Sequence, residues 1–313
     1  ARQGGRIRPA SAVAVAQGLD VPATRQRRQP PQRAAPVAPL STRNSEGPRL
    51  SDFAAAASFS AARRICARSA AVSEGLGAIA TVGDPLGRSG SWLGGVDFTY
   101  ATSRFRGNKN LLAGVWGLAT DRLGLGRDAT SYGFKVDYPN DLWDINLTYK
   151  RIGRDFDPSL GFVPRRAVHL ISAQTNNRTR LSRGPLQQLF HQFQLSVATD
   201  LSGHWESYRI FVAPINWRFR SGDRFEVNVN PTGERLVEPF KIADGVVIPP
   251  GPYHWRRYRL EVGTAQKRRL YSQVTWWFGG FYNGDLDQIV WTGAWNPTPL
   301  VTVEFNGERN IGR

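Results

Sequence analysis

The sequence predicts an all-β fold of about 12 antiparallel strands over residues 90–313, preceded by a disordered or poorly ordered segment, residues 1–85. From about residue 90 onward, apolar and polar residues alternate with a period of two. Successive side chains of a strand point to opposite faces of a sheet, so this spacing is typical of strands. Turn-forming sequences separate the runs, and no helical run lies between them. No repeat of about 20–50 residues recurs, so the pattern does not support a propeller.

The N-terminal segment differs in composition from the rest of the chain. Residues 1–70 contain 12 Arg, no Lys and three acidic residues, which gives +9 of the formal net charge of +16. Arg25–Pro39 is rich in Pro, Gln and Arg, and such a composition cannot build a packed core. A short basic helix is the only regular structure expected here, at Ala54–Ala57 and Ala61–Arg68. We interpret the segment as a solvated tail; the alternative is a tail that binds nucleic acid or anionic lipid.

The strands are most easily recognised in a hairpin around the turn 139–141. In Ser131–Tyr138 every second residue is aromatic or aliphatic, and the same pattern recurs over residues 142–152. One face of the hairpin is therefore apolar and the other polar. The same reasoning predicts further strands at 92–101, 110–120, 167–177, 192–200, 210–220, 224–230, 254–264, 270–280, 286–296 and 300–308.

Alternation alone does not show whether the apolar face meets a protein core or lipid. The strand at 142–152 would extend roughly 36 Å, and a tilt of about 40° brings its rise to roughly 28 Å, close to the apolar band of an outer membrane. Tyr and Trp, which favour the membrane–water boundary, stand at the ends of the apolar faces. They are Tyr132 and Tyr138, Trp143 and Tyr149, and Trp92 and Tyr100.

The predicted connections differ in length between the two rims of the sheet. Short turns are expected on one rim, at 139–141, 221–223, 265–269 and 297–299. Long loops are expected on the other rim, at 121–129, 153–166 and 231–253. Segments 178–191 and 201–204 do not fit this separation. Outer-membrane barrels have this arrangement. A transmembrane helix is excluded, because no window reaches 18 uncharged apolar residues. The pattern leaves a membrane barrel and a soluble β-fold both open.

Two long loops carry distinctive sequences, Asp155–Arg165 and Glu234–Tyr253. Together with Gly95–Phe98 and Arg257–Leu260, they resemble the bacterial domain of unknown function (DUF) 5916. The resemblance covers about residues 90–313. It implies a large outer-membrane β-barrel in the cell envelope, often found downstream of a family-9-like carbohydrate-binding module, with no settled activity. On this basis we expect a transmembrane barrel.

The chain departs from that family in two respects. Residues 1–75 do not look like strands and contain no carbohydrate-binding module, and an out-of-frame translation is one interpretation of this start. The chain also ends at Asn310–Arg313, where the family continues, so we expect an incomplete barrel whose C-terminal strands are missing. Since the sequence contains no methionine, we further expect a processed or internal fragment.

The two loops are expected to be stiff and to fold into the mouth of the barrel. Pro158, Gly161 and Pro164 would shape the first loop, with Phe156 and Phe162 as its anchors, and the Pro-rich run 249–252 would extend the second. The first loop is not an EF-hand, because Leu160 and Arg166 occupy the positions of the required Gly and Glu. The candidate loop residues are Asp155, Phe156, Asp157, Pro158, Gly161, Phe162, Arg165, Glu238, Pro239, Phe240, Pro249, Pro250, Gly251 and Tyr253.

The sequence contains no recognisable catalytic or metal-binding motif. The four histidines are scattered, and Cys66 has no partner histidine. Acid pairs such as Asp285 with Asp287, or Glu234 with Glu238, are expected by chance among 25 acidic residues. We therefore predict no enzyme activity, no metal and no cofactor.

The polar face of the strands is expected to line a hydrated lumen. Its residues are polar, and the charged ones among them carry both signs: Lys135, Asp137, Asp144, Asn146, Lys150, Arg224, Glu226 and Asn228. We predict an outer-membrane pore or surface-display barrel with weak selectivity, in contact with membrane lipid and with a saccharide or another small solute. The alternative is a soluble β-rich protein that binds carbohydrate or nucleic acid. Nucleic acid is the less favoured ligand, because more than half of the net charge lies in the tail.

Overall fold

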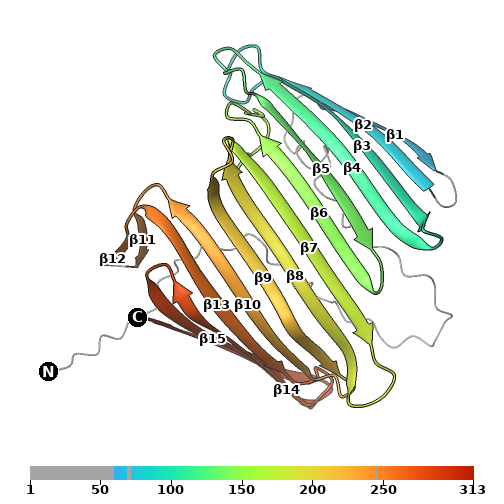
Figure 1. Cartoon of the computed structure of the whole chain (residues 1–313), viewed down its shortest axis with the longest axis vertical. Helices are drawn as coiled ribbons and strands as arrows, with labels where there is room; N and C mark the ends of the chain where they lie inside the picture. Colours follow the sequence, from blue (N-terminus) through green and yellow to red (C-terminus); the bar gives the residue numbers. More distant parts are fainter. Residues whose placement is uncertain (1–59, 69–71, 244) are drawn as a thin grey trace.

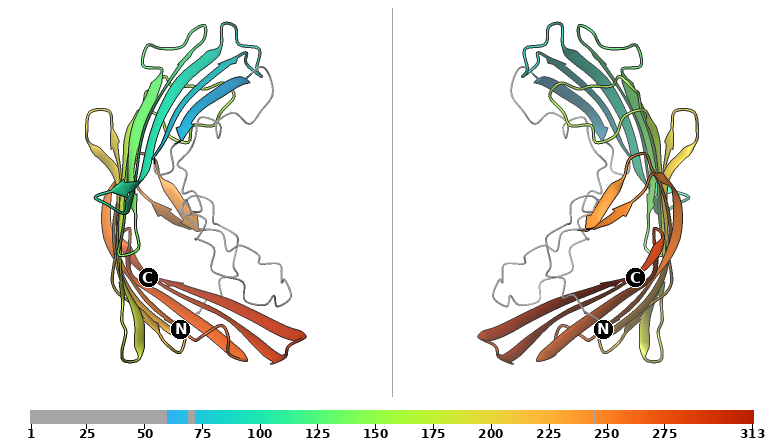
Figure 2. Two further views of the ribbon diagram at one scale, coloured as in Figure 1. Left: turned by 90° about the vertical axis from the view of Figure 1, so that its right-hand side faces the viewer. Right: turned by 90° about the vertical axis from the view of Figure 1, so that its left-hand side faces the viewer.

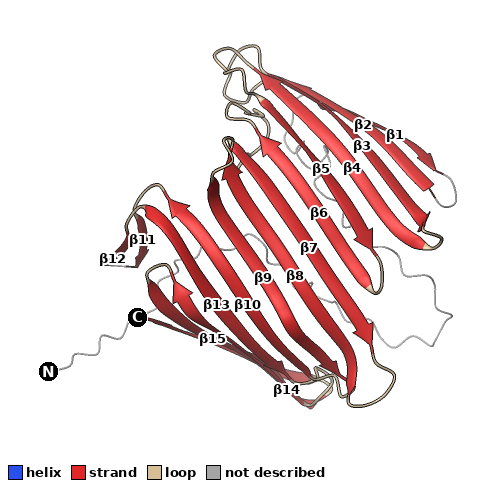
Figure 3. Ribbon diagram, viewed as in Figure 1, coloured by secondary structure: helices blue, strands red, loops and turns tan. Residues whose placement is uncertain are grey.

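The computed structural model describes residues 60–68, 72–243 and 245–313. Every regular element within these residues is a β-strand, and 14 strands form one antiparallel sheet (Figure 1, Figure 3). The all-β prediction is therefore confirmed. The described residues contain no helix long and apolar enough to cross a membrane.

The large sheet is a meander, in which each strand pairs with the strands next to it along the chain. Its strands are β1 (Ser60–Arg68), β2 (Val72–Val82), β3 (Trp92–Phe105), β4 (Lys109–Asp121), β5 (Thr130–Pro139), β6 (Trp143–Ile152), β7 (Val168–Arg180), β8 (Leu186–Asp200), β9 (Trp205–Phe219), β10 (Arg224–Leu236), β13 (Gly251–Gly263), β14 (Leu270–Phe281), β15 (Gly284–Thr298) and β16 (Val301–Gly312). Between β10 and β13, the strands β11 (Phe240–Ala243) and β12 (Val246–Ile248) form a separate hairpin.

Two strands lie where the sequence predicts a poorly ordered segment. β1 and β2 fall within residues 1–85, so the prediction is wrong there, and Ala61–Arg68 is a strand and not a helix. β2 is hard to recognise because Gly77 and Ala78 carry too little side chain to mark its two faces. These two strands raise the count from about 12 to 14. Ala54–Ala57 and Arg25–Pro39 lie outside the described residues.

The sheet is a single layer bent into an open trough (Figure 2). The hairpin β11–β12 lies on its concave side. β1 and β16 form the two edges and do not pair with each other in the described part of the chain. Each strand therefore has one concave and one convex face, and the two faces differ in chemistry.

Connection lengths separate the two rims only in part. One rim carries only short turns, at 106–108, 140–142, 181–185, 220–223, 264–269 and 299–300. The opposite rim carries the longest connections, 153–167 and 237–250, and also 83–91 and 122–129, but the short turns 201–204, as expected, and 282–283 lie on it too. Segment 178–191 was expected to be a long connection on the short-turn rim. Most of it is strand, so the connection there is short. The loop predicted at 231–253 is shorter than expected, because β10 continues to Leu236 and β13 begins at Gly251.

Candidate functional site

The two faces of the sheet reverse the usual distribution of polar and apolar side chains. The convex face of β5 and β6 exposes large apolar residues, with Tyr132 46%, Phe134 38% and Ile145 40% accessible. On the opposite face, Asp137 and Glu226 are buried and Asn228 is completely inaccessible. Buried polar groups need hydrogen-bond partners, so the concave face must satisfy its own side chains.

All eight polar residues predicted to share a face do share the concave one. On β5 and β6, register places Asp137 opposite Asn146 and Pro139 opposite Asp144, with Lys135 and Lys150 at alternate positions of the same face. On β10, Arg224, Glu226 and Asn228 alternate in the same way. Asn146 hydrogen-bonds Asp137, which also pairs with Lys135 at 2.7 Å, and Asp144 pairs with Arg178 of β7 at 2.8 Å.

Arg259 of β13 is the centre of a charged network on this face. Its guanidinium donates to Glu226 and Asn228 of β10 and lies 3.5 Å from Glu261. Arg224 pairs with Glu261 at 2.9 Å, and Asn228 donates to Glu226 at 3.0 Å. Both signs of charge are thus held close together with most of their hydrogen bonds satisfied.

Aromatic rings flank this network. The Arg259 guanidinium lies 5.8 Å from the ring centroid of Phe211 and 5.4 Å from that of Trp277, and Arg257 lies 5.6 Å from Trp277. Arg259, Glu261 and Trp277 were not among the site residues predicted from the sequence. The alternation of Arg257, Arg259 and Glu261 with Tyr258, Leu260 and Val262 is the signal that would have indicated them.

The loop 153–167 turns back onto the concave face near the long-loop rim. Phe156 is only 3% exposed and packs against Ile79, Leu93 and Leu118 of three different strands. Phe162, predicted as a second anchor, is 82% exposed, so that prediction is wrong; Val163 packs against the cluster instead. The loop turns at Pro158, whose carbonyl accepts a hydrogen bond from the Gly161 amide at 2.6 Å.

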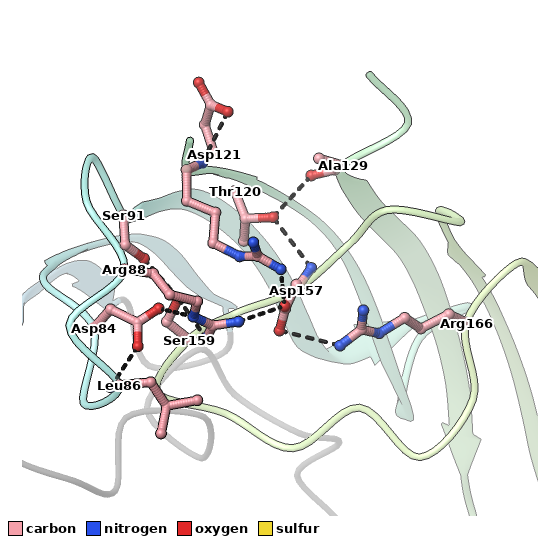
Figure 4. Close-up of polar contacts among 11 residues, drawn as sticks. Asp84, Leu86, Arg88, Ser91, Thr120, Asp121, Ala129, Asp157, Ser159 and Arg166 are labelled. Carbon is pink, nitrogen blue, oxygen red and sulfur yellow. Dashed lines mark hydrogen bonds and ion pairs between the residues drawn. The ribbon is translucent and has the colours of Figure 1, made fainter. Parts of the chain in front are cut away.

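Asp157 ties this loop to its neighbours on the rim (Figure 4). Its carboxylate pairs with Arg122 at 2.7 Å, Arg166 at 3.1 Å and Arg88 at 3.2 Å, and its amide donates to Thr120 Oγ1 at 3.3 Å. Burial would raise the pKa of Asp157, but the hydrogen bond from Arg122 and the charges of the three arginines hold this pKa below its usual range. The carboxylate is therefore the ionised centre of an arginine cluster.

Asp155 and Arg165 fix the two sides of the same loop. Asp155 accepts a hydrogen bond from the Asp128 amide at 3.1 Å, and Arg165 pairs with Glu206 of β9 at 3.1 Å. Asp128 in turn pairs with Arg151 at 2.8 Å. Burial alone would raise the pKa of Asp128, but the amide of Arg154 and the Arg151 side chain hold it below its usual range.

The second loop, 237–250, packs against Tyr282, a residue that was not predicted from the sequence. Phe240 and Tyr253 contact the Tyr282 ring at centroid distances of 6.1 Å and 5.4 Å. Tyr282 donates to Glu234 at 2.7 Å; burial first, and then the carboxylate of Glu234, raises the pKa of Tyr282. Tyr253 donates to the carbonyl of Pro249 at 2.8 Å. Gly251 has φ 155°, a backbone conformation that residues with a side chain rarely adopt.

The remaining residues of this loop face the surroundings. Glu238, Pro239, Pro249 and Pro250 are exposed, whereas Ile248 is buried. Both long connections therefore reach the concave side, each through a few buried contacts.

The described residues contain no cluster of three or more His, Cys, Asp or Glu that could hold a metal ion. Each of the four histidines has a partner of its own: His169 contacts Tyr149, His191 the carbonyl of Pro214, His204 Asp200, and His254 Tyr208.

Comparison of the chain with family models, with curated proteins and with solved structures finds no match in any of the three. The resemblance to the domain of unknown function 5916 therefore stays a prediction.

Proposed function

We propose that the chain forms a membrane-spanning β-barrel of a bacterial outer membrane, whose concave face lines a hydrated passage for a saccharide or another small solute. In this arrangement the convex face contacts acyl chains. The two long loops, 153–167 and 237–250, stand at the mouth of the passage and narrow it.

One observation carries the proposal: most strands expose large apolar side chains on the convex face, whereas charged and amide side chains are buried on the concave face. Soluble monomers rarely expose a contiguous apolar patch of more than a few hundred Å². Here the exposed apolar residues extend over most strands of the sheet, from Val96 and Val115 through Leu147 and Phe193 to Ile289. Lipid is a medium in which such a face is stable.

Aromatic residues at both rims support the same proposal. On the convex face, Trp92, Tyr132, Tyr149 and Tyr208 lie toward the long-loop rim. Tyr138, Trp143, Trp217, Phe225 and Trp295 lie toward the short-turn rim. Aliphatic residues dominate the band between them. Outer-membrane barrels have such girdles because Tyr and Trp favour the boundary between lipid and water.

The mixed charges of the concave face support a pore rather than a dry core. A hydrated lumen accommodates networks such as the one around Arg259, whereas a soluble sheet packed on a second layer would bury apolar side chains there. Because both signs line the surface, we expect weak ion selectivity. The edge strands β1 and β16 must find partners in the membrane, since an unpaired backbone group in lipid costs several kcal/mol.

The proposal is tested by refolding the chain into detergent and then into liposomes. We expect a heat-modifiable band on gels, aggregation when detergent is removed without lipid, and conductance steps in planar bilayers. A protein that stays monomeric and folded in plain buffer would contradict the proposal and favour the soluble alternative. Binding of oligonucleotides with a steep salt dependence would then indicate a nucleic-acid ligand.

A further inference from the structure

The convex face carries a groove over β9, β10 and β13, near the long-loop rim. Its volume is about 610 Å³. One wall comes from β9, the other from β13 and the floor from β10; the lining residues are Tyr208, Ile210, Val229, Pro231, His254, Trp255, Arg256 and Tyr258. β10 runs toward the long-loop rim, so Val229 and Tyr258 lie deeper along the sheet than Pro231 and His254.

We propose that this groove binds one anionic phospholipid, whose phosphate charge is not neutralised by a cation in its own headgroup, with an acyl chain along the floor and the phosphate at the end nearest the rim. The inference rests on the proposed function, because it requires the convex face to lie in a membrane. It adds a specific lipid site to a surface that would otherwise contact lipid without preference.

The rim end of the groove is built by three strands in register. Gly233 of β10 pairs with Tyr208 of β9 and with His254 of β13. A Cβ at Gly233 would lie 2.2 Å from the Tyr208 ring, so only glycine lets that ring lie over β10. The Tyr208 hydroxyl then reaches 3.0 Å from Nδ1 of His254, which fixes the imidazole.

Two arginines complete this end of the groove. Arg256 lines it, and the Arg235 guanidinium lies 5.0 Å from the ring centroid of Trp205, whose ring is in turn 4.7 Å from that of His254. Within the described part of the chain, neither arginine forms an ion pair with a carboxylate. Most other arginines of the rim are paired with acids, as Arg122, Arg151 and Arg165 are.

The chemistry of this cluster favours a phosphate ester with net negative charge over one that a choline cation neutralises. Guanidinium groups bind phosphate oxygens through paired N–H donors, and they do so best where apolar surroundings exclude water. The aliphatic floor of Val229 and Pro231 continues from the cations toward the middle of the sheet, which is the direction an acyl chain takes from its headgroup.

The test uses the detergent-solubilised full chain with equal amounts of phosphatidylglycerol and phosphatidylcholine of identical acyl chains. Native mass spectrometry counts the lipids that remain bound. We expect the wild type to retain phosphatidylglycerol several-fold more than phosphatidylcholine. Arg256→Gln, and more completely Arg235→Gln with Arg256→Gln, should remove this preference. Inorganic phosphate in excess should not displace the lipid, since it lacks the acyl chain.

Arg309→Gln is the matched control, because it removes one charge from the convex face of β16, away from the groove. If Arg309→Gln lost the preference for phosphatidylglycerol as fully as Arg256→Gln does, the inference would be overturned. The total charge of the protein would then explain the preference. A wild type that inserts into liposomes but retains both lipids equally would overturn the lipid site and leave the proposed barrel standing. A chain that never inserts would overturn both.

Discussion

The carboxylate of Asp157, in the loop between β6 and β7, lies 2.7 Å from Nη2 of Arg122, in the loop between β4 and β5. Arg88, from the loop between β2 and β3, joins the same carboxylate at 3.2 Å. Three connections of one rim are therefore held by a single side chain. The position of the loop 153–167 over the concave face depends on that carboxylate.

We predict that Asp157→Asn loosens this loop. The change removes the charge that three arginines share, and losing such charge-assisted hydrogen bonds costs about 1–3 kcal/mol. Limited proteolysis should cut within 153–167 faster than in the wild type. The control is Asp141→Asn on the short-turn rim, whose pair with Arg180 at 2.9 Å is exposed and should contribute little. Equal cleavage of the two variants would contradict the role assigned to Asp157.

The same carboxylate predicts a pH dependence. The pKa of Asp157 is lower in the folded protein than the ordinary value of 3.8. Its stabilising contribution is therefore fully present above the unfolded pKa and is lost as the pH falls through the lowered folded pKa. Cleavage of the loop by an acid-active protease should rise as the pH falls below about 4. The cleavage rate of Asp157→Asn should depend less on pH than that of the wild type. Identical pH profiles for the two proteins would mean that other titrating groups cause the pH dependence.

The fold could be predicted from the sequence wherever large side chains alternate. Strands such as β5 and β6 were recognised because Tyr132, Phe134 and Ile145 mark one face. β2 was missed because its glycines and alanines carry little pattern, and its pairing with β3 is a contact that only the folded chain shows.

The site was harder to predict, because loops have no periodicity. Phe156 and Phe162 look alike in sequence, yet one is buried and the other exposed. Tyr282 occupies a short turn, and its partner Glu234 lies 48 residues away. Such contacts depend on how β10 and β14 come together around β13, and composition does not encode this.

Phe156 and Phe162 provide a test of which residue anchors the loop. Phe156→Ala should destabilise the folded protein by about 3–5 kcal/mol, because it leaves a cavity among Ile79, Leu93 and Leu118. Phe162→Ala should have almost no effect, since that ring is exposed. Urea titration in detergent measures both variants. Comparable losses would mean that Phe162 has contacts that its exposure does not indicate.

The Arg259 network predicts how the lumen discriminates ions if the chain is a pore. Arg259→Gln leaves Glu226 and Glu261 without a shared partner, so the reversal potential in a salt gradient should shift toward cation preference. Glu226→Gln should shift it toward anions. Arg309→Gln removes a charge from the convex face and should leave the reversal potential unchanged. Shifts of the same sign in both concave-face variants would contradict the proposed lining.

Two adjacent residues in the middle of β8 separate a lipid-facing surface from a water-facing one. Phe193 is 40% exposed on the convex face, opposite Thr175 and Val212, whereas Gln194 lies on the concave face opposite Gln174 and Phe211. In a membrane, Phe193→Arg places a charge near the bilayer midplane and should cost about 2–4 kcal/mol, while Gln194→Arg faces the lumen and should be tolerated. Refolding yield into liposomes measures both. In a soluble protein, Phe193→Arg would refold as well as Gln194→Arg or better. Phe193 would already face water there, so an arginine at this position would have no lipid to avoid.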